Sequence, residues 1–365
     1  MNKRTQRVVV AMSGGVDSSV AAALLARAGY DVVGMMMRLW SEPAMGGAAH
    51  NRCCTPTQMS DARRIADQLG IPFFVLDTQD VFRGTVVQAF IAGHRSGDTP
   101  NPCLECNRRI RFEWLLNHAL ALDADYLATG HYARITRDAA GGWQLRRGRD
   151  DNKDQSYVLS VLGQAQLSRA MFPVGGYPKA QVRALAAELG LDVAGRQDSQ
   201  DLCFLGQGDY RDFLRLHAPD VMRAGPIMTT TGNMLGEHGG LANYTIGQRK
   251  GLGLSYREPL YVLATNPLRN ALIVGTRDQL GRDFLTAEGV NWVSGAPPDS
   301  QFRAQVKIRY RAQPQPAEVL APSADSFEAR FDEPQRDITP GQAAVIYADD
   351  ICLGGGIIAK FADEP

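Results

Sequence analysis

The sequence predicts an α/β protein in which a parallel-sheet domain is followed by a small central domain and a C-terminal, all-β, barrel-like domain. Strand-like and helix-like segments alternate in the first half of the chain, as in right-handed βαβ units. From Ala224 onward Gly and Pro become dense, and short β-branched or aromatic runs replace long helices. These observations place the domains at residues 1–220, 221–282 and 283–365.

Each element follows from hydrophobic periodicity and from start and stop residues. The helix over 17–29, for example, has Val20, Leu24 and Leu25 on one side and Gly29 as a stop signal. Strands are predicted over 7–12, 32–39, 73–76, 125–129, 261–264, 271–274, 302–309, 327–331 and 343–347. The remaining helices are predicted over 57–70, 81–94, 107–122, 155–162, 178–190 and 210–217.

Composition limits the class of protein. The 365 residues are 44% hydrophobic and 21% charged, which excludes a disulfide-stapled miniprotein and global disorder. The longest apolar runs, such as 30–39, are shorter than the ~20 residues that span a bilayer, and the first residues have no signal-peptide pattern. We therefore expect a cytoplasmic protein with reduced cysteines and no membrane partner.

Charge leaves the question of a nucleic-acid partner open. The 39 basic and 39 acidic residues balance, and only local patches matter to a phosphate backbone. Basic residues cluster over 134–153 and over 303–311. A solvated strand face explains each cluster as well as an RNA contact does.

The first turn from strand to helix, AMSGGVDSS over 11–19, is the main chemical motif. Gly14 and Gly15 allow a sharp turn, and the free N–H groups of the helix start then point at an anion. The sequence lacks both GxxxxGK[ST] and GxGxxG. The motif therefore predicts a pyrophosphate loop in which Asp17 holds Mg²⁺ or orients a hydroxyl, with an ordinary N-capped helix as the alternative.

Cysteines form the second group of candidates. Cys103 and Cys106 lie in TPNPCLECN, where Asn107 is expected to cap a helix over 108–122. Cys106 would then precede a helix start, where the dipole and the neighbouring arginines lower a thiol pKa. Zinc would need further ligands, and Cys53 and Cys54 are adjacent. Thiol chemistry is favoured, while a structural metal and an iron–sulfur cluster stay open.

Several motifs occur in one order along nearly the whole chain. SGGVDS over 13–18 matches the signature of the PP-loop ATP pyrophosphatases. NPCLECN, TGHY over 129–132, KDQS over 153–156, DSQDLCF and YTIGQRKGLG follow it. Together, between Ser13 and Gln342, they resemble the tRNA-specific 2-thiouridylases. The resemblance implies an adenine-nucleotide α-hydrolase-like domain.

In that family the C2 oxygen of the wobble uridine of certain tRNAs is replaced by sulfur. The resemblance implies ATP and Mg²⁺ as cofactors, with ATP cleaved to AMP and pyrophosphate while the base oxygen is adenylated. It further implies the tRNA anticodon arm as a partner and a cysteine desulfurase or a sulfur-relay protein as the donor. Cys106 would be the nucleophile, and Cys203 would carry the sulfur as a persulfide. These two thiols must come within disulfide reach at some step.

The other implied roles fall into three groups. The residues expected to hold ATP are Ala11, Met12, Ser13, Gly14, Gly15, Val16, Asp17, Ser18, Met37 and Gly130. The target-base pocket would contain Asn101, Pro102 and Cys103. The tRNA contacts would be His131, Lys153, Asp154, Gln155, Arg309, Tyr310 and Gln342.

One departure from the family keeps a variant open. Many relatives have Asp where Cys103 stands, so Cys103, Cys106 and Cys203 are three thiols able to converge on a [4Fe-4S] cluster. A PP-loop amide-forming ligase is the alternative enzyme, and it needs no thiol pair. A non-catalytic nucleotide sensor is the third hypothesis, since it would bind ATP without releasing pyrophosphate.

Overall fold

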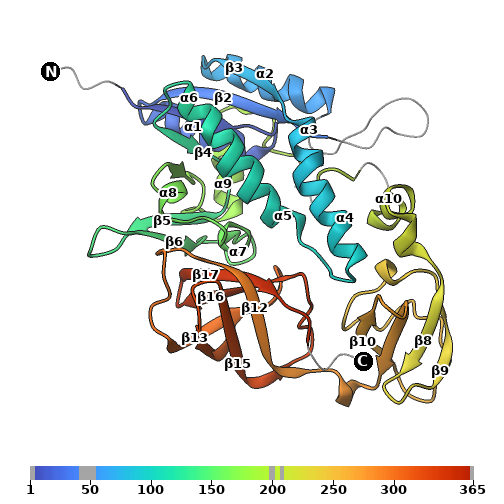
Figure 1. The fold of residues 1–365 in the computed structure, drawn as a ribbon. Coiled ribbons are helices and arrows are strands. Elements are labelled where there is room, and N and C mark those ends of the chain that lie inside the picture. The colour runs from blue at the N-terminus through green and yellow to red at the C-terminus, as the bar shows by residue number, and fades with distance from the viewer. Residues whose placement is uncertain (1–4, 41–54, 197–201, 206–208, 362–365) are drawn as a thin grey trace.

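The computed structural model describes residues 5–40, 55–196, 202–205 and 209–361, which fold into three sheets (Figure 1). Cys53, Cys54, Asp198 and Ser199 lie outside these residues. The predicted α/β class is confirmed: a parallel-sheet domain is followed by a small central sheet and a closed C-terminal barrel.

The first sheet is parallel, in the order β3-β2-β1-β4-β7. Its strands are β1 (Arg7–Ala11), β2 (Asp31–Arg38), β3 (Phe73–Asp77), β4 (Tyr126–Ala128) and β7 (Ala170–Met171). Alternate residues of the central strand β1 point to opposite faces, and both faces are covered. Val8 and Val10 pack with α1 (Val16–Arg27), α2 (Pro56–Leu69) and α9 (Lys179–Glu188), whereas Val9 packs with the helix that carries Phe112.

The helix that carries Phe112 begins earlier than predicted. It runs continuously through α5 (Pro102–Glu105), a stretch of wider π-type turns, η2 (Cys106–Leu115), and α6 (Leu116–Ala121). Asn101 is its cap, because the Asn101 side chain accepts a hydrogen bond from the Cys103 N–H at 3.1 Å and Pro102 occupies the first helical position. The predicted cap at Asn107 is therefore wrong, and Cys106 lies inside the helix.

The other helices of the described residues comprise one further long run and several short helices. A second continuous run comprises α3 (Gln79–Phe82), η1 (Arg83–Val87) and α4 (Gln88–Arg95). The others are α7 (Ser156–Leu159), α8 (Gln164–Leu167), α10 (Tyr210–His217) and the 3₁₀ turns η3 (Pro219–Met222), η4 (Leu241–Asn243) and η5 (Arg277–Gln279). No helix of the described residues is long and apolar enough to cross a membrane.

The second half of the chain is built of strands, as predicted. The central sheet has the order β10-β11-β8-β9 and comprises β8 (Gly225–Thr229), β9 (Met234–His238), β10 (Tyr261–Asn266) and β11 (Ala271–Gly275). The barrel is antiparallel, and β12 closes it by pairing with both β15 and β17. Its strands are β12 (Arg282–Trp292), β13 (Gln301–Lys307), β14 (Gln315–Leu320), β15 (Ser326–Gln335), β16 (Ala343–Ala348) and β17 (Ile351–Ile358).

A hairpin from the N-terminal half extends the barrel sheet, which the sequence analysis did not predict. It consists of β5 (Ala133–Arg137) and β6 (Trp143–Arg147), and β6 pairs with β17 through Cys352 and Leu145. Figure 1 shows this hairpin between the parallel-sheet domain and the barrel. The hairpin therefore sets how the barrel approaches the nucleotide loop.

Candidate functional site

A cavity of about 370 Å³ opens at the carboxyl ends of β1, β2 and β4, where open α/β sheets bind ligands. Nine of the ten residues predicted to hold ATP line it: Ala11, Met12, Ser13, Gly15, Val16, Asp17, Ser18, Met37 and Gly130. Cys203, Tyr310, Lys153, Gln155 and His131 line the same cavity. The fold thus brings the loop, one of the two predicted reactive thiols and several predicted RNA contacts to one place.

The nucleotide loop is held rigidly by its own hydrogen bonds. Gly14 has a φ of +73°, and a Cβ there would come within 2.5 Å of the Gln58 carbonyl oxygen. The Ser13 N–H donates to Ser18 Oγ at 3.2 Å, and Ser19 Oγ donates to the Gly15 carbonyl oxygen at 2.8 Å. Gly14 therefore supports the turn from outside the cavity, while the first residues of α1 line it.

Two residues that the sequence analysis missed hold the Asp17 carboxylate. Lys179 Nζ contacts Asp17 Oδ1 at 2.7 Å and Oδ2 at 2.8 Å, and the Tyr132 hydroxyl donates to Oδ1 at 2.6 Å. Arg196 likewise reaches the loop, with Nη1 donating to the Gly14 carbonyl oxygen at 2.9 Å. Lys179, Tyr132 and Arg196 all line the cavity. Of these three residues, only Tyr132 lies in one of the sequence motifs, TGHY over 129–132.

The loop after β4 packs closely on the nucleotide loop. A Cβ at Gly130 would come within 2.7 Å of the Ser18 nitrogen, so only glycine fits. The next residue, His131, pairs through Nδ1 with Thr129 Oγ1 at 2.7 Å. Burial, and to a smaller extent the nearby Arg111 charge, lowers the pKa of His131 to about 3. Its imidazole is therefore neutral at physiological pH.

The predicted base-pocket segment is held between the helix and the barrel. Asn101 caps the helix, Pro102 is buried and Cys103 is exposed in its first turn. Gln342 Nε2 donates to the Thr99 carbonyl oxygen at 2.6 Å. Burial first, and then the nearby Asp154 and Cys103, raise the pKa of Tyr310, so Tyr310 lies close to this segment.

Cys106 and Cys203 belong to one hydrophobic cluster. Cys106 is 3% exposed, and Cys203 packs at the edge of the same cluster together with Met37. The neighbouring Phe204 is 1% exposed and anchors residues 202–205 against three phenylalanine rings, those of Phe82, Phe90 and Phe213. The two thiols therefore lie on the same side of the molecule despite their separation in sequence.

The predicted RNA contacts divide into two groups. His131, Lys153, Gln155 and Tyr310 face the cavity. Asp154 is 3% exposed and accepts hydrogen bonds from the Gly148 N–H and the Ser156 N–H and hydroxyl, so it supports a loop from inside. Arg309 Nη2 is bonded to the Ile246 carbonyl oxygen and Thr339 Oγ1, and Gln342 is bonded to Thr99. As they lie here, these three residues hold segments together rather than present free polar groups.

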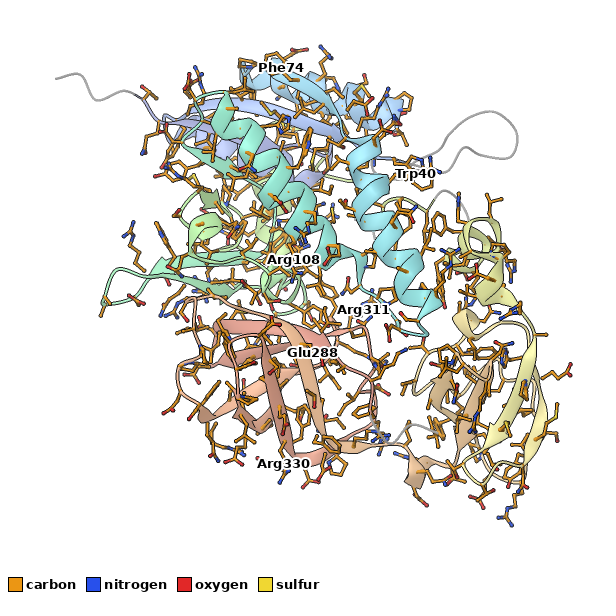
Figure 2. The ribbon with its side chains drawn as sticks, in the orientation of Figure 1. Trp40, Phe74, Arg108, Glu288, Arg311 and Arg330 are labelled. Carbon is orange, nitrogen blue, oxygen red and sulfur yellow. The ribbon has the colours of Figure 1, made fainter. Side chains whose placement is uncertain are left out.

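Two further arginines lie where the helix that carries Cys106 and the barrel approach each other. Figure 2 shows Arg108 on the helix that carries Cys106 and Arg311 at the adjoining edge of the barrel. In the cluster over 134–153, by contrast, Arg134 and Arg146 both pair with Asp350, at 2.6 and 2.7 Å. These two arginines of the cluster therefore stabilise the contact between the hairpin and the barrel.

The donor set fits Mg²⁺ held jointly with a ligand. Asp17 supplies one carboxylate beside the Ser13 and Ser18 hydroxyls, and Mg²⁺ commonly takes one or two carboxylates plus phosphate oxygens. In the part of the chain that the structure describes, no three His, Cys, Asp or Glu side chains are grouped to bind one metal ion.

Three family models together match almost the whole chain. Residues 6–207 match the model described as "tRNA methyl transferase HUP domain", and residues 211–276 match the "tRNA methyl transferase PRC-barrel domain". Residues 282–358 match the "Aminomethyltransferase beta-barrel domain". The three matches follow the order of the three sheets.

Curated relatives are similar over nearly their full length. The tRNA-specific 2-thiouridylase of Chloroflexus aggregans is 50% identical over 353 residues, which is 97% of this chain and 98% of the relative. That of Moorella thermoacetica is 48% identical over 97% of this chain and 99% of the relative. Among solved structures, a U34-tRNA thiolase of Methanococcus maripaludis with its [4Fe-4S] cluster overlaps 60% of this chain and 69% of its own, with 20% identity and a TM-score of 0.36.

Proposed function

Because the chain belongs to the tRNA-specific 2-thiouridylase family, we propose that it replaces the C2 oxygen of the wobble uridine of tRNA by sulfur, using ATP to activate that oxygen. The supporting observation is that a single cavity is lined by the nucleotide loop, by Cys203 and by Tyr310 of the barrel side. A nucleotide, a sulfur carrier and a base-stacking ring can therefore meet in one place.

The first step is adenylation. The uridine C2 oxygen attacks the α-phosphorus of ATP, the bond between the α- and β-phosphates breaks, and pyrophosphate leaves. The helix-start N–H groups of the loop at 13–18 and Mg²⁺ on Asp17 would stabilise the departing negative charge. A carbonyl oxygen is a poor leaving group, whereas AMP is a good one, so the base becomes open to attack at C2.

The second step transfers sulfur. Cys203 carries a persulfide, and the Cys106 thiolate attacks Cys203 Sγ, which releases HS⁻ and forms a disulfide between the two residues. The sulfide attacks C2, AMP leaves with its oxygen, and 2-thiouridine remains. A cellular thiol then reduces the disulfide. In the alternative order, the terminal persulfide sulfur attacks C2 directly and AMP leaves. Cys106 then attacks Cys203 Sγ, which releases 2-thiouridine and forms the same disulfide.

The base reaches the site from a single-stranded anticodon loop, where leaving the stack costs little free energy. Asn101, Pro102 and Cys103 would surround the flipped uridine, while Lys153 and Tyr310 would contact the neighbouring backbone and bases. Arg311 at the edge of the barrel would add positive charge for the tRNA backbone. Asp154, Arg309 and Gln342 would act by holding the contacting segments in place.

The same proposal places the protein in the cytoplasm, where tRNA, ATP and reducing thiols occur together. A cysteine desulfurase or a sulfur-relay protein would load Cys203. Cys203 is half-buried at the wall of an open cavity, so it can be reached without unfolding of the core.

The decisive experiment compares pyrophosphate release with thiolation. Full-length protein receives tRNA, ATP and a persulfide donor, and the Cys106→Ser and Cys203→Ser variants are compared with Cys352→Ser, which changes a buried thiol of β17. We expect both site variants to release pyrophosphate but to form less than about 1% of the thiouridine, while Cys352→Ser forms it normally. Full thiouridine formation in both site variants would overturn the roles given to these two thiols. Pyrophosphate release without thiouridine even in the unaltered protein would instead favour an amide-forming ligase, and nucleotide binding without pyrophosphate release would indicate a sensor.

A further inference from the structure

A buried lysine of the cavity wall has no role in the scheme above. Lys179 is the first residue of α9 and is only 9% exposed. Its backbone N–H donates to Asp150 Oδ2 at 2.9 Å, which fixes the helix start, and its ammonium group contacts both oxygens of Asp17. Residues 17 and 179 are 162 positions apart, so only the fold brings this charge to the nucleotide loop.

These contacts compete with metal binding by Asp17 in its present arrangement. Oδ1 accepts from both Lys179 and the Tyr132 hydroxyl, and Oδ2 accepts from Lys179. A carboxylate offers about four lone-pair directions, and three are taken by these donors. For Asp17 to bind Mg²⁺, the ammonium group of Lys179 has to leave or to share the carboxylate.

The cavity also needs positive charge once a polyphosphate enters. The loop has no lysine of the GxxxxGK[ST] kind, and Arg196 is already shared between the Gly14 carbonyl oxygen and Asp61, at 2.9 and 2.7 Å. Lys179 lines the cavity and has a flexible stem with a compact charge, which suits movement between two partners.

We propose that Lys179 neutralises Asp17 while the cavity is empty and passes to the phosphate oxygens of the incoming nucleotide, which leaves the Asp17 carboxylate to Mg²⁺. The exchange rests on the proposed ATP-dependent function and adds a residue to it. It keeps the charge of the pocket balanced in both states, because a negative partner is always present for Lys179 and a positive one for Asp17.

Binding measurements on the full chain test the exchange without relying on catalysis. Mn²⁺ serves as a paramagnetic probe for Mg²⁺, and α,β-methylene-ATP serves as a nucleotide that cannot be cleaved at the relevant bond. Without nucleotide, Lys179→Met should bind Mn²⁺ at least about 5-fold more tightly than the unaltered protein. With Mg²⁺, it should bind the analogue at least about 10-fold more weakly.

Lys307→Met is the matched control, since Lys307 is also buried, at 5% exposed, but does not line the cavity. Both affinities should stay unchanged in Lys307→Met, and Lys179→Arg should recover part of the analogue affinity. A Lys179→Met protein that is less stable but binds Mn²⁺ and the analogue like the unaltered protein would show a purely structural ion pair and overturn the exchange.

A second variant covers the case in which Lys179→Met does not fold. In EDTA, Asp17→Asn should bind the analogue at least about 3-fold more tightly, because Lys179 is released to the phosphates. An unchanged or weaker affinity in Asp17→Asn would contradict the exchange. If the unaltered protein bound no adenine nucleotide, the proposed function would fail. If the unaltered protein bound the nucleotide and the variants bound Mn²⁺ and the analogue with the same affinities, only the exchange would fail.

Discussion

The Gln342 side-chain amide donates a hydrogen bond to the Thr99 carbonyl oxygen at 2.6 Å, although the two residues are 243 positions apart. A second hydrogen bond, from the Thr99 N–H to the Pro340 carbonyl oxygen at 2.9 Å, lies beside it. The barrel therefore holds the segment that leads into Asn101 and Cys103.

We predict that Gln342→Ala lowers kcat/KM for tRNA about 5-fold while leaving ATP affinity unchanged, because one hydrogen bond contributes about 1 kcal/mol to the position of this segment. Gln301→Ala is the control, since it loses a surface hydrogen bond to Glu318 on the barrel and should have normal kinetics. Thiolation kinetics at saturating ATP measure both. A fall in ATP affinity in Gln342→Ala would argue against a role of Gln342 in positioning this segment alone.

The two loop glycines should respond differently to a methyl group. Gly14 has a φ of +73° and no room beside the Gln58 carbonyl oxygen, whereas a Cβ at Gly15 meets only Ser13 Oγ, at 3.4 Å. Gly14→Ala should lose at least about 1–2 kcal/mol of unfolding free energy from the backbone conformation alone. Gly15→Ala should fold almost normally, and urea unfolding of both variants makes the comparison. Equal losses would mean that the described turn is not what distinguishes the two positions.

Substitutions at two neighbouring residues of the KDQS motif should distinguish a structural role from direct contact with tRNA. Asp154 is buried and accepts three hydrogen bonds, so Asp154→Ala should destabilise the protein by about 2–4 kcal/mol. Lys153 faces the cavity, so Lys153→Ala should weaken tRNA binding at least several-fold with little change in stability. Thermal unfolding and filter binding at fixed salt distinguish the two. A stable Asp154→Ala protein with weak tRNA binding would point to direct contact by Asp154.

The low pKa of His131, about 3, makes stability depend on pH in a predictable direction. Between about pH 6.5 and 3 the unfolded chain binds a proton at this residue and the folded protein does not, so unfolding free energy falls as the pH is lowered. The contribution is at most about 1.4 kcal/mol per pH unit. His131→Gln should remove it, which is seen by comparing urea unfolding at pH 7 and pH 5 with the unaltered protein. His94, whose pKa burial lowers to about 4, contributes the same slope to both proteins.

Cys103 provides the test between persulfide and cluster chemistry. It is exposed in the first helical turn, whereas Cys106 is buried in the next turn. We expect anaerobically purified protein to contain less than about 0.1 iron per chain and Cys103→Ser to keep at least half of the thiolation activity. Iron and sulfide quantitation, followed by activity of the same preparation, measures both. Near four irons per chain, lost in Cys103→Ser, would favour the cluster-dependent route.

Local pattern was sufficient for β1, β2, β3 and β4 and for the longer helices around them, because strand and helix periods are written in consecutive residues, but it did not predict the two-residue strand β7. It failed at the start of the helix that carries Cys106, where the cap is Asn101 and not Asn107, although proline, as at Pro102, is favoured at the first helical position. It also missed the hairpin over 133–147, because β6 completes its pairing with β17, about 200 residues later.

The order of the motifs from Ser13 to Gln342 was enough to identify the family and to predict the nucleotide loop, since those signals are local runs of residue types. The partners of Asp17, the burial of Cys106, and the internal roles of Asp154, Arg309 and Gln342 depended on the folded chain. They arise from contacts between segments far apart in sequence, and nothing near either residue of such a pair records the other. Which charges neutralise one another is therefore decided only when the sheet, α9 and the barrel pack together.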